Sequence, residues 1–259
     1  MKSNKYLYYT INPTEQLFKQ LNGFLYFLKL TKESKEILVL PRFELKGKLY
    51  DYKLLFDNKI IKDNFNVIDF DDYDPNFDTR EFINSFASIY GDYFSFRKYI
   101  KYNKKYYDII SSHKIEPYLA VHWRQNDFVR LRPTHILSKE QLIDCVKETL
   151  KETGLKKVYI STDSNDLDAL KYIHEHLPTF TYKQQNNITN VDYAILESLI
   201  CANAAYFIGT NLSFYSSNII GERVNMGKLD NYELRLPGRG VTTYSQKLDI
   251  KAILPITNK

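Results

Sequence analysis

The second half of the chain alternates short apolar runs with amphipathic helical segments, and this rhythm restricts the fold more than any other feature. Apolar runs at 118–124, 156–161 and 206–208 are each followed by residues with the apolar spacing of a helix. The helix after the first run is expected to begin at Ser138, in a capping box, and to end at Gly154. Alternating strands and helices build a parallel, doubly wound sheet, so the sequence predicts an α/β fold.

The first half begins in the same style. A strand is expected at 6–11, a helix at 14–32 and a buried strand at 37–40, whereas residues 78–112 are expected to be mostly helical. A boundary near 113–117 then gives two Rossmann-like lobes with a central cleft.

Length and composition agree with two lobes, residues 1–117 and 118–259. The chain has 259 residues, and its hydrophobic fraction of 44% can fill two cores. The less regular tail, 235–259, could return to the first lobe. A net charge of +5 does not require nucleic acid and suits a small anionic ligand equally well. Cys145 and Cys201 cannot form a disulfide framework.

The N-terminus lacks the apolar core of a signal peptide, and no run is long enough to span a membrane. We therefore expect a cytoplasmic protein, with the lumen of the endoplasmic reticulum as the alternative if the chain has been trimmed. A glycan on the sequon Asn211-Leu212-Ser213 would crowd the loop after 206–208, which also favours the cytoplasm.

Polar residues follow two of the predicted strands. The run 118–124 ends in His122 and Arg124, and Asp127 follows shortly after. In open α/β sheets, ligands bind at such strand ends. An arginine there offers a planar fork to phosphate oxygens. The run Gly209-Thr210-Asn211-Leu212-Ser213-Phe214 opens a further helix, whose N-terminal amides could hold an anion. The alternatives are a solvated strand end and a serine N-cap without a ligand.

Other candidates are weaker. The pair Asp69 and Asp71 could hold a divalent metal, but solvated carboxylates explain it as well. The Lys- and Tyr-rich stretch 97–107 fits a nucleic-acid patch or a solvated basic face. Glu15, after a predicted strand, could be a general base or a first-turn residue facing the helix dipole. No histidines have metal-binding spacing.

Taken in order, four motifs resemble the protein O-fucosyltransferases, particularly the branch that modifies thrombospondin repeats. They are His122–Phe128, similar to His-Leu-Arg-x-x-Asp-Phe; 157–163, a strand ending in Thr-Asp; 197–223, containing Phe207-Ile208-Gly209-Thr210; and the N-terminal Tyr6–Glu15 with Leu38–Pro41. The resemblance is dense over 118–223 and 6–43.

This resemblance implies a GT-B fold, a GDP-fucose donor, no metal or other cofactor, and inversion while fucose moves to a hydroxyl, expected on Ser or Thr of a protein. It makes Arg124 the residue that holds the β-phosphate and Glu15 the catalytic base. It places the remaining donor-binding residues at His122, Asp127, Asp163, Gly209, Thr210, Ser213 and Phe214. The expected partners are the donor and a protein or glycan acceptor, without nucleic acid or membrane.

The chain also departs from the family pattern. It has Gln16-Leu17-Phe18-Lys19-Gln20 where the family usually has Gly-Phe-Asn after the acid, and Phe214 replaces a Ser or Thr. The alternatives are therefore a transferase that uses another GDP-sugar or a saccharide acceptor, as in the bacterial α1,6-fucosyltransferases, and a non-catalytic binder of nucleotide-sugars or nucleic acid.

Overall fold

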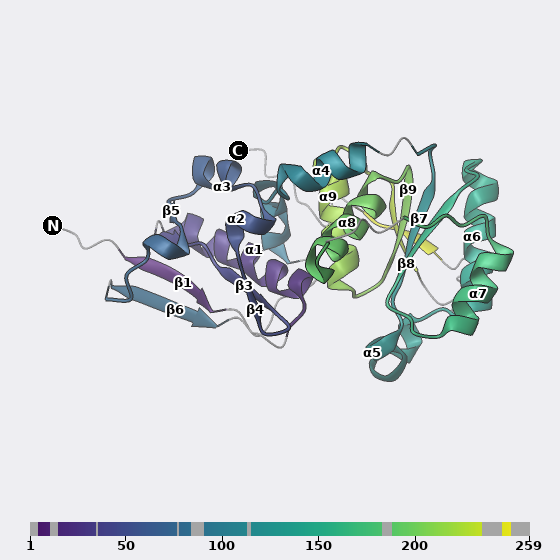
Figure 1. Cartoon of the computed structure of the whole chain (residues 1–259), viewed down its shortest axis with the longest axis horizontal. Helices are drawn as coiled ribbons and strands as arrows, with labels where there is room; N and C mark the ends of the chain where they lie inside the picture. Colours follow the sequence, from purple (N-terminus) through teal and green to yellow (C-terminus); the bar gives the residue numbers. More distant parts are fainter. Residues whose placement is uncertain are drawn as a thin grey trace. The chain divides into compact units, whose positions relative to one another are not determined.

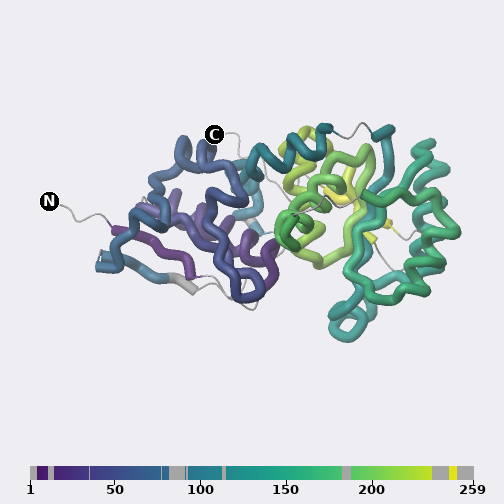
Figure 2. The backbone as a smooth tube through the Cα atoms, viewed as in Figure 1, coloured from purple at the N-terminus to yellow at the C-terminus, as the bar shows by residue number. Residues whose placement is uncertain are grey.

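The computed structural model describes residues 5–10, 15–34, 36–76, 78–83, 91–112, 115–182, 188–234 and 245–249. These residues form two compact units, the first drawn from Met1–Ile109 with Asn190–Asp192 and the second from Ile110–Thr189 with Tyr193–Ile250. Each unit contains a parallel sheet of its own, as the sequence predicts (Figures 1 and 2). None of the helices within the described ranges is both long and apolar enough to cross a membrane.

The second half of the chain forms a sheet with helices on both faces. Its elements are β7 (Leu119–Trp123), α5 (Asn126–Leu131), η3 (Pro133–His135), α6 (Lys139–Thr153), β8 (Val158–Thr162), α7 (Leu167–His176), α8 (Asn190–Asn203), β9 (Tyr206–Thr210), α9 (Phe214–Asn225), β10 (Asn231–Leu234) and β11 (Ser245–Lys247). The strand order is β11-β10-β9-β7-β8, and only the β10–β11 pair is antiparallel. Helices α6 and α7 cover one face, and α8 and α9 cover the other (Figure 1).

Local signals explain why these elements form where they do. Ser138 caps α6 in a complete capping box with Gln141, and Gly154 ends the helix at a φ of 72°. Because side chains alternate along a strand, Leu119 and Val121 of β7 enter the core beneath α6 and α7. The predicted helix from Ser138 to Gly154 and the predicted strand at 118–124 are both confirmed.

Strand β9 is longer than the sequence predicts. Residues 206–208 were expected, but Gly209 and Thr210 also belong to the strand because β10 pairs with it through Leu234, opposite Thr210. The strand therefore carries Thr210 to the very edge of the sheet.

The first half contains a four-stranded parallel sheet and a hairpin. Its elements are β1 (Tyr6–Thr10), α1 (Leu17–Ser34), β2 (Ile37–Val39), β3 (Arg42–Leu45), β4 (Lys48–Asp51), α2 (Tyr52–Leu55), α3 (Asn58–Asn64), β5 (Val67–Ile68), η1 (Phe70–Asp72), β6 (Thr79–Ile83), η2 (Asp92–Tyr99) and α4 (Lys104–Ser111). The order of the parallel strands is β5-β2-β1-β6.

The prediction that residues 78–112 are mostly helical is wrong in part. Thr79–Ile83 is strand β6, which pairs in parallel with all five residues of β1, and 92–99 is a 3₁₀ helix. Polar residues dominate the start of β6, so its strand conformation comes from tertiary pairing rather than from an apolar run. The expected return of the tail to the first lobe remains a prediction, because 235–244 and 250–259 lie outside the described residues, while β11 pairs with β10.

Candidate functional site

Three strand ends meet at one edge of the second sheet. Strand β7 lies between β8 and β9, and all three are parallel. The Thr162 hydroxyl on β8 donates to Trp123 O at 2.6 Å, and the Thr210 hydroxyl on β9 donates to His122 O at 2.7 Å. Thr210 Oγ1 also accepts from Arg124 N at 2.9 Å. The end of β7 is therefore fixed from both neighbouring strands, at the edge where the sequence predicts a ligand.

Arg124 follows β7 directly, and two carboxylates hold its guanidinium. Nε and Nη2 donate to Asp127 Oδ1 at 3.0 and 2.7 Å, and Nη1 lies 2.8 Å from Asp163 Oδ2. The Gln125 amide positions Asp163 in turn by donating to its Oδ1 at 2.7 Å. Nε–H and one Nη2–H are thus hydrogen-bonded, and Nη1 forms an ion pair with Asp163, so the guanidinium has N–H groups left for an oxyanion. The structure thus brings Asp163, which the sequence places in a different motif, next to Arg124 and Asp127.

The turn from β9 into α9 forms the next part of this edge. Gly209 has no room for a side chain, because a Cβ there would lie 2.8 Å from Ser216 Oγ. Ser213 is the N-cap of α9, and its hydroxyl accepts from Ser216 N at 3.4 Å. Phe214 opens the helix and is half-buried. Because the first amides of a helix attract anions, α9 can share an oxyanion with Arg124.

His122 is buried beside Arg124 and faces α9. Its Nδ1 lies 2.7 Å from Ser216 Oγ, and its ring packs against Tyr215 with 4.7 Å between ring centroids. Burial, reinforced by the neighbouring Arg124, lowers the pKa of His122 to about 3. The imidazole is therefore neutral at physiological pH and can take part only through hydrogen bonds.

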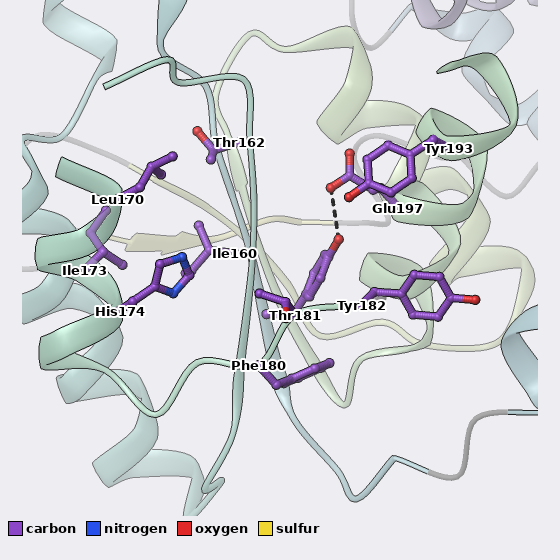
Figure 3. A pocket seen from close by; sticks show the side chains of 11 residues that line it. Ile160, Thr162, Leu170, Ile173, His174, Phe180, Thr181, Tyr182, Tyr193 and Glu197 are labelled. Carbon is purple, nitrogen blue, oxygen red and sulfur yellow. Dashed lines mark hydrogen bonds between the residues drawn. The ribbon is translucent and has the colours of Figure 1, made fainter. Parts of the chain in front are cut away.

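A pocket of about 130 Å³ lies beside β8, next to this edge (Figure 3). Residues of β8, α7, α8 and the segment after α7 line it: Tyr159, Ile160, Thr162, Leu170, Ile173, His174, Phe180, Thr181, Tyr182, Tyr193 and Glu197. Thr162, whose hydroxyl donates to Trp123 O at the end of β7, also belongs to this lining. The pocket and the Arg124 guanidinium therefore adjoin the same strand end.

The pocket contains a partly buried carboxyl group. Glu197 Oε1 accepts a hydrogen bond from the Tyr159 hydroxyl at 2.9 Å, the dashed line in Figure 3. Burial raises the pKa of Glu197 to about 7, and the bond from Tyr159 opposes that rise. A carboxyl that titrates near neutrality in a pocket is a candidate for ligand recognition.

The outer edge of β8 adds main-chain groups to the pocket. Val158 N donates to Pro178 O at 3.1 Å and Val158 O accepts from Phe180 N at 3.0 Å, so the main chain of Val158 faces this edge. Alternate residues of a strand face the same edge, which places the N–H and C=O of Ile160 there as well. No described group bonds with them. Together with the aromatic walls, this arrangement suits a planar heterocycle that carries both donors and acceptors.

Glu197 and Tyr159 were not predicted as site residues from the sequence. A signal was present, because Glu197 is the charged residue within the apolar stretch 195–201 of α8. A carboxylate in such a stretch requires a partner or a ligand.

Glu15 lies in the first unit, between β1 and α1. Strand β1 is the point where the strand order reverses, with β2 on one side and β6 on the other, and open α/β sheets bind ligands at such points. Glu15 Oε1 lies 2.5 Å from Lys19 Nζ, and the Glu15 side chain is 10% exposed. Buried Gln20 donates to Glu15 O at 2.6 Å and to Glu44 O at 2.7 Å. Gln20, one of the departures from the family pattern, thus fixes the main chain at Glu15.

The metal interpretation of Asp69 and Asp71 gains no support. Lys62 lies 2.6 Å from Asp69, and Arg42 and Lys53 lie 2.6 and 3.0 Å from Asp71. Both carboxylates are therefore neutralised by side chains of the same unit. In the described part of the chain, no three His, Cys, Asp or Glu side chains are grouped to hold a metal ion.

The Lys- and Tyr-rich stretch is mostly occupied with structural contacts. Arg97, Tyr102 and Tyr106 are buried. Lys104 pairs with Asp108 at 2.6 Å, and Lys105 pairs with Asp192 at 3.1 Å. These contacts leave few cations and rings for a nucleic-acid surface.

Sequence comparisons give the chain a family. The family model for GDP-fucose protein O-fucosyltransferase matches residues 87–226, more than half of the 259 residues. GDP-fucose protein O-fucosyltransferase 2 of Caenorhabditis elegans is 30% identical over 114 residues, which cover 43% of this chain and 27% of that protein. The Homo sapiens protein of the same name is 31% identical over 115 residues, with 43% and 27% covered. The match thus spans about a quarter of the length of these relatives.

Solved structures share the fold over most of the chain. POFUT1 superposes with a TM-score of 0.65 at 16% identity and covers 90% of this chain and 98% of its own. The α-1,6-fucosyltransferase NodZ gives 0.63 at 12% identity, with 96% and 99% covered. The predicted GT-B-like α/β fold is confirmed. With the ordered motifs around Arg124, Asp163 and Gly209 and the family match over 87–226, the chain belongs to the GDP-fucose protein O-fucosyltransferase family.

Proposed function

We propose that the protein transfers fucose from GDP-fucose to a hydroxyl group, on Ser or Thr of a protein, with inversion at the anomeric carbon. The observation that carries the proposal is the Arg124 guanidinium, which is hydrogen-bonded to Asp127, ion-paired with Asp163 and still has N–H groups for a diphosphate. The names of the worm and human relatives support the donor and the acceptor class. A solved POFUT1 complex contains GDP-fucose.

Two neighbouring features divide the donor between them. The diphosphate binds Arg124 and the first amides of α9, which follow Ser213. The guanine enters the pocket beside β8, where its ring N–H and amino groups donate to Glu197 and its carbonyl accepts from Ile160 N. Arg124 recognises the diphosphate and the pocket recognises the base. Together they select a nucleotide over inorganic phosphate.

Charge stabilisation and proton transfer drive the reaction. As the bond between the anomeric carbon and the β-phosphate oxygen breaks, Arg124 neutralises the charge that builds on GDP, without a metal. The acceptor hydroxyl attacks the opposite face of the sugar, and Glu15 takes its proton. Glu15 Oε2 has no partner among the residues that the structure describes, so one oxygen remains for this proton.

Calorimetry with GDP, together with donor hydrolysis and transfer assays, tests the proposal. Arg124→Ala should weaken GDP binding by about two orders of magnitude, because it removes charge-assisted hydrogen bonds worth about 1.5–3 kcal/mol each. Arg130→Ala is the matched control, since Arg130 is exposed on α5 and should behave like wild type. Normal turnover by Arg124→Ala would remove the basis of the assignment.

A donor and acceptor panel separates the alternatives. GDP-fucose, GDP-mannose and GDP-glucose should be compared, each with serine- and threonine-containing protein acceptors and with oligosaccharides. NodZ, whose fold the chain shares, makes the oligosaccharide arm necessary. Binding of GDP without hydrolysis or transfer of any sugar would favour the non-catalytic alternative.

A further inference from the structure

Ser216 connects the two strand ends that carry the site. It lies in the first turn of α9 and is 1% exposed. Its Oγ accepts from Thr210 N at 2.9 Å and lies 2.7 Å from His122 Nδ1. Thr210 in turn binds His122 O and Arg124 N through its own hydroxyl. One buried hydroxyl thus contacts both β7 and β9 directly behind Arg124.

The geometry decides where the protons lie. The Thr210 amide donates to one lone pair of Ser216 Oγ, and the single hydroxyl hydrogen of Ser216 needs an acceptor. His122 Nδ1 is the acceptor that the surrounding residues provide, since apart from the Thr210 amide Ser216 Oγ has no other hydrogen-bond partner in the described chain. If Nδ1 carried the proton instead, the enclosed Ser216 hydroxyl would have no acceptor, which folding disfavours.

The opposite ring nitrogen is left for a ligand. His122 stays neutral because burial and Arg124 lower its pKa to about 3. A neutral ring whose Nδ1 accepts must carry its proton on Nε2. Nε2 bonds with no described group, so it is the ring nitrogen that can donate to a ligand.

We propose that Ser216 is a positioning residue that fixes His122 as the Nε2–H tautomer, so that His122 offers a neutral hydrogen-bond donor to the diphosphate beside Arg124. The proposal rests on the proposed function for the identity of the ligand, but not for the tautomer. A neutral donor adds a directed contact without adding charge, so it supplements Arg124 and does not compete with it for Asp127 or Asp163.

The tautomer can be measured in the free protein. Long-range ¹H–¹⁵N correlation spectra distinguish protonated from unprotonated ring nitrogens, and the chain has only 5 histidines. His122→Gln assigns the signal by its loss. We expect wild-type His122 to show a protonated Nε2 and an unprotonated Nδ1, whereas Ser216→Ala should shift Nδ1 and mix the two tautomers. A protonated Nδ1 in wild type, or a Ser216→Ala spectrum identical to wild type, overturns the proposal.

Binding measurements test the consequence for the ligand. Ser216→Ala should weaken GDP binding about five- to tenfold, the usual effect of one neutral hydrogen bond, and leave guanosine binding unchanged. Ser217→Ala is the matched control, because Ser217 is equally buried on α9 but donates to Phe214 O. Equal GDP affinities for Ser216→Ala and wild type overturn the donor role. If wild type binds no GDP, the proposed function fails, while the spectrum still decides the tautomer.

Discussion

The two units hold their candidate reactive groups in different ways. In the second unit, Arg124 is bonded through its main chain to Thr210 and through its side chain to Asp127 and Asp163. In the first unit, the Glu15 carboxylate has one ion pair within the described residues, with Lys19 of α1. A group that stabilises developing charge benefits from a fixed position, whereas a base must release and regain a proton. The second unit thus holds Arg124 rigidly, whereas the first unit leaves the Glu15 carboxylate adjustable.

The largest effect should come from the adjustable side. Glu15→Gln keeps the size of the side chain but cannot accept a proton, so transfer should fall by about 10³-fold while the dissociation constant for GDP stays the same. Initial rates of fucose transfer and calorimetry check both parts. Lys19→Met, which removes the ion pair and keeps the carboxylate, should retain most of the activity. If Glu15→Gln turns over normally, the base lies elsewhere and the comparison fails.

The second unit also contains a buried arginine at the opposite end of β9 from Thr210. Arg223 is 0% exposed and donates to Asn231 Oδ1 and to the carbonyl oxygens of Ala202, Ala204, Ala205 and Asp230. Arg223→Met leaves Asn231 Oδ1, Ala205 O and Asp230 O without this donor, while Lys228 Nζ still donates to Ala202 O and Ala204 O. The free energy of unfolding should therefore fall by at least about 3 kcal/mol. Urea denaturation measures this loss. Arg130→Met, on exposed α5, should change it little, and equal stabilities would show that the network is dispensable.

The pocket carboxyl should make the second unit sensitive to pH. Folding raises the pKa of Glu197 from 4.5 to about 7, so the folded state keeps a proton that the unfolded chain releases. The wild-type free energy of unfolding should therefore fall as the pH rises from about 4.5 through 7.

Glu197→Gln removes that titration. The stability of this variant relative to wild type should increase by roughly 2–3 kcal/mol between pH 4.5 and pH 8. Urea denaturation at both pH values measures the difference, and Glu148→Gln, on the exposed side of α6, is the control. A difference that does not depend on pH would mean that Glu197 is already ionised in the folded protein at low pH.

The smallest effect should come from the close approach at the end of β9. Gly209→Ala places a Cβ 2.8 Å from Ser216 Cβ and Oγ, so either β9 or the first turn of α9 must shift. The free energy of unfolding should fall by about 1–2 kcal/mol, with a further loss of GDP affinity because Ser216 supports His122. Thermal unfolding and calorimetry measure the two effects. If Gly209→Ala matches wild type in both quantities, this edge accommodates a Cβ without cost, contrary to the expectation from its contacts.

The second unit could be predicted in detail because its signals are local. The cap at Ser138 and the turn at Gly154 fix α6, and parallel strands bring Arg124 and Asp163 to one edge once their strands are recognised. Strand β6 could not be predicted in this way, since its conformation depends on pairing with β1, more than 70 residues away. The pocket was missed for the same reason, because Glu197 and Tyr159, 38 residues apart, meet only when α8 packs on β8.

In the proposed reaction, the carboxylates around Arg124 also bear on the release of the product. A diphosphate that reaches this guanidinium meets a cation whose charge Asp127 and Asp163 already offset in part. Its net attraction for the diphosphate is therefore smaller than that of an unpaired arginine. When the sugar has left, the spent nucleotide is held less tightly than an unpaired arginine would hold it. An arrangement that orients the donor thereby also provides for the release of the product.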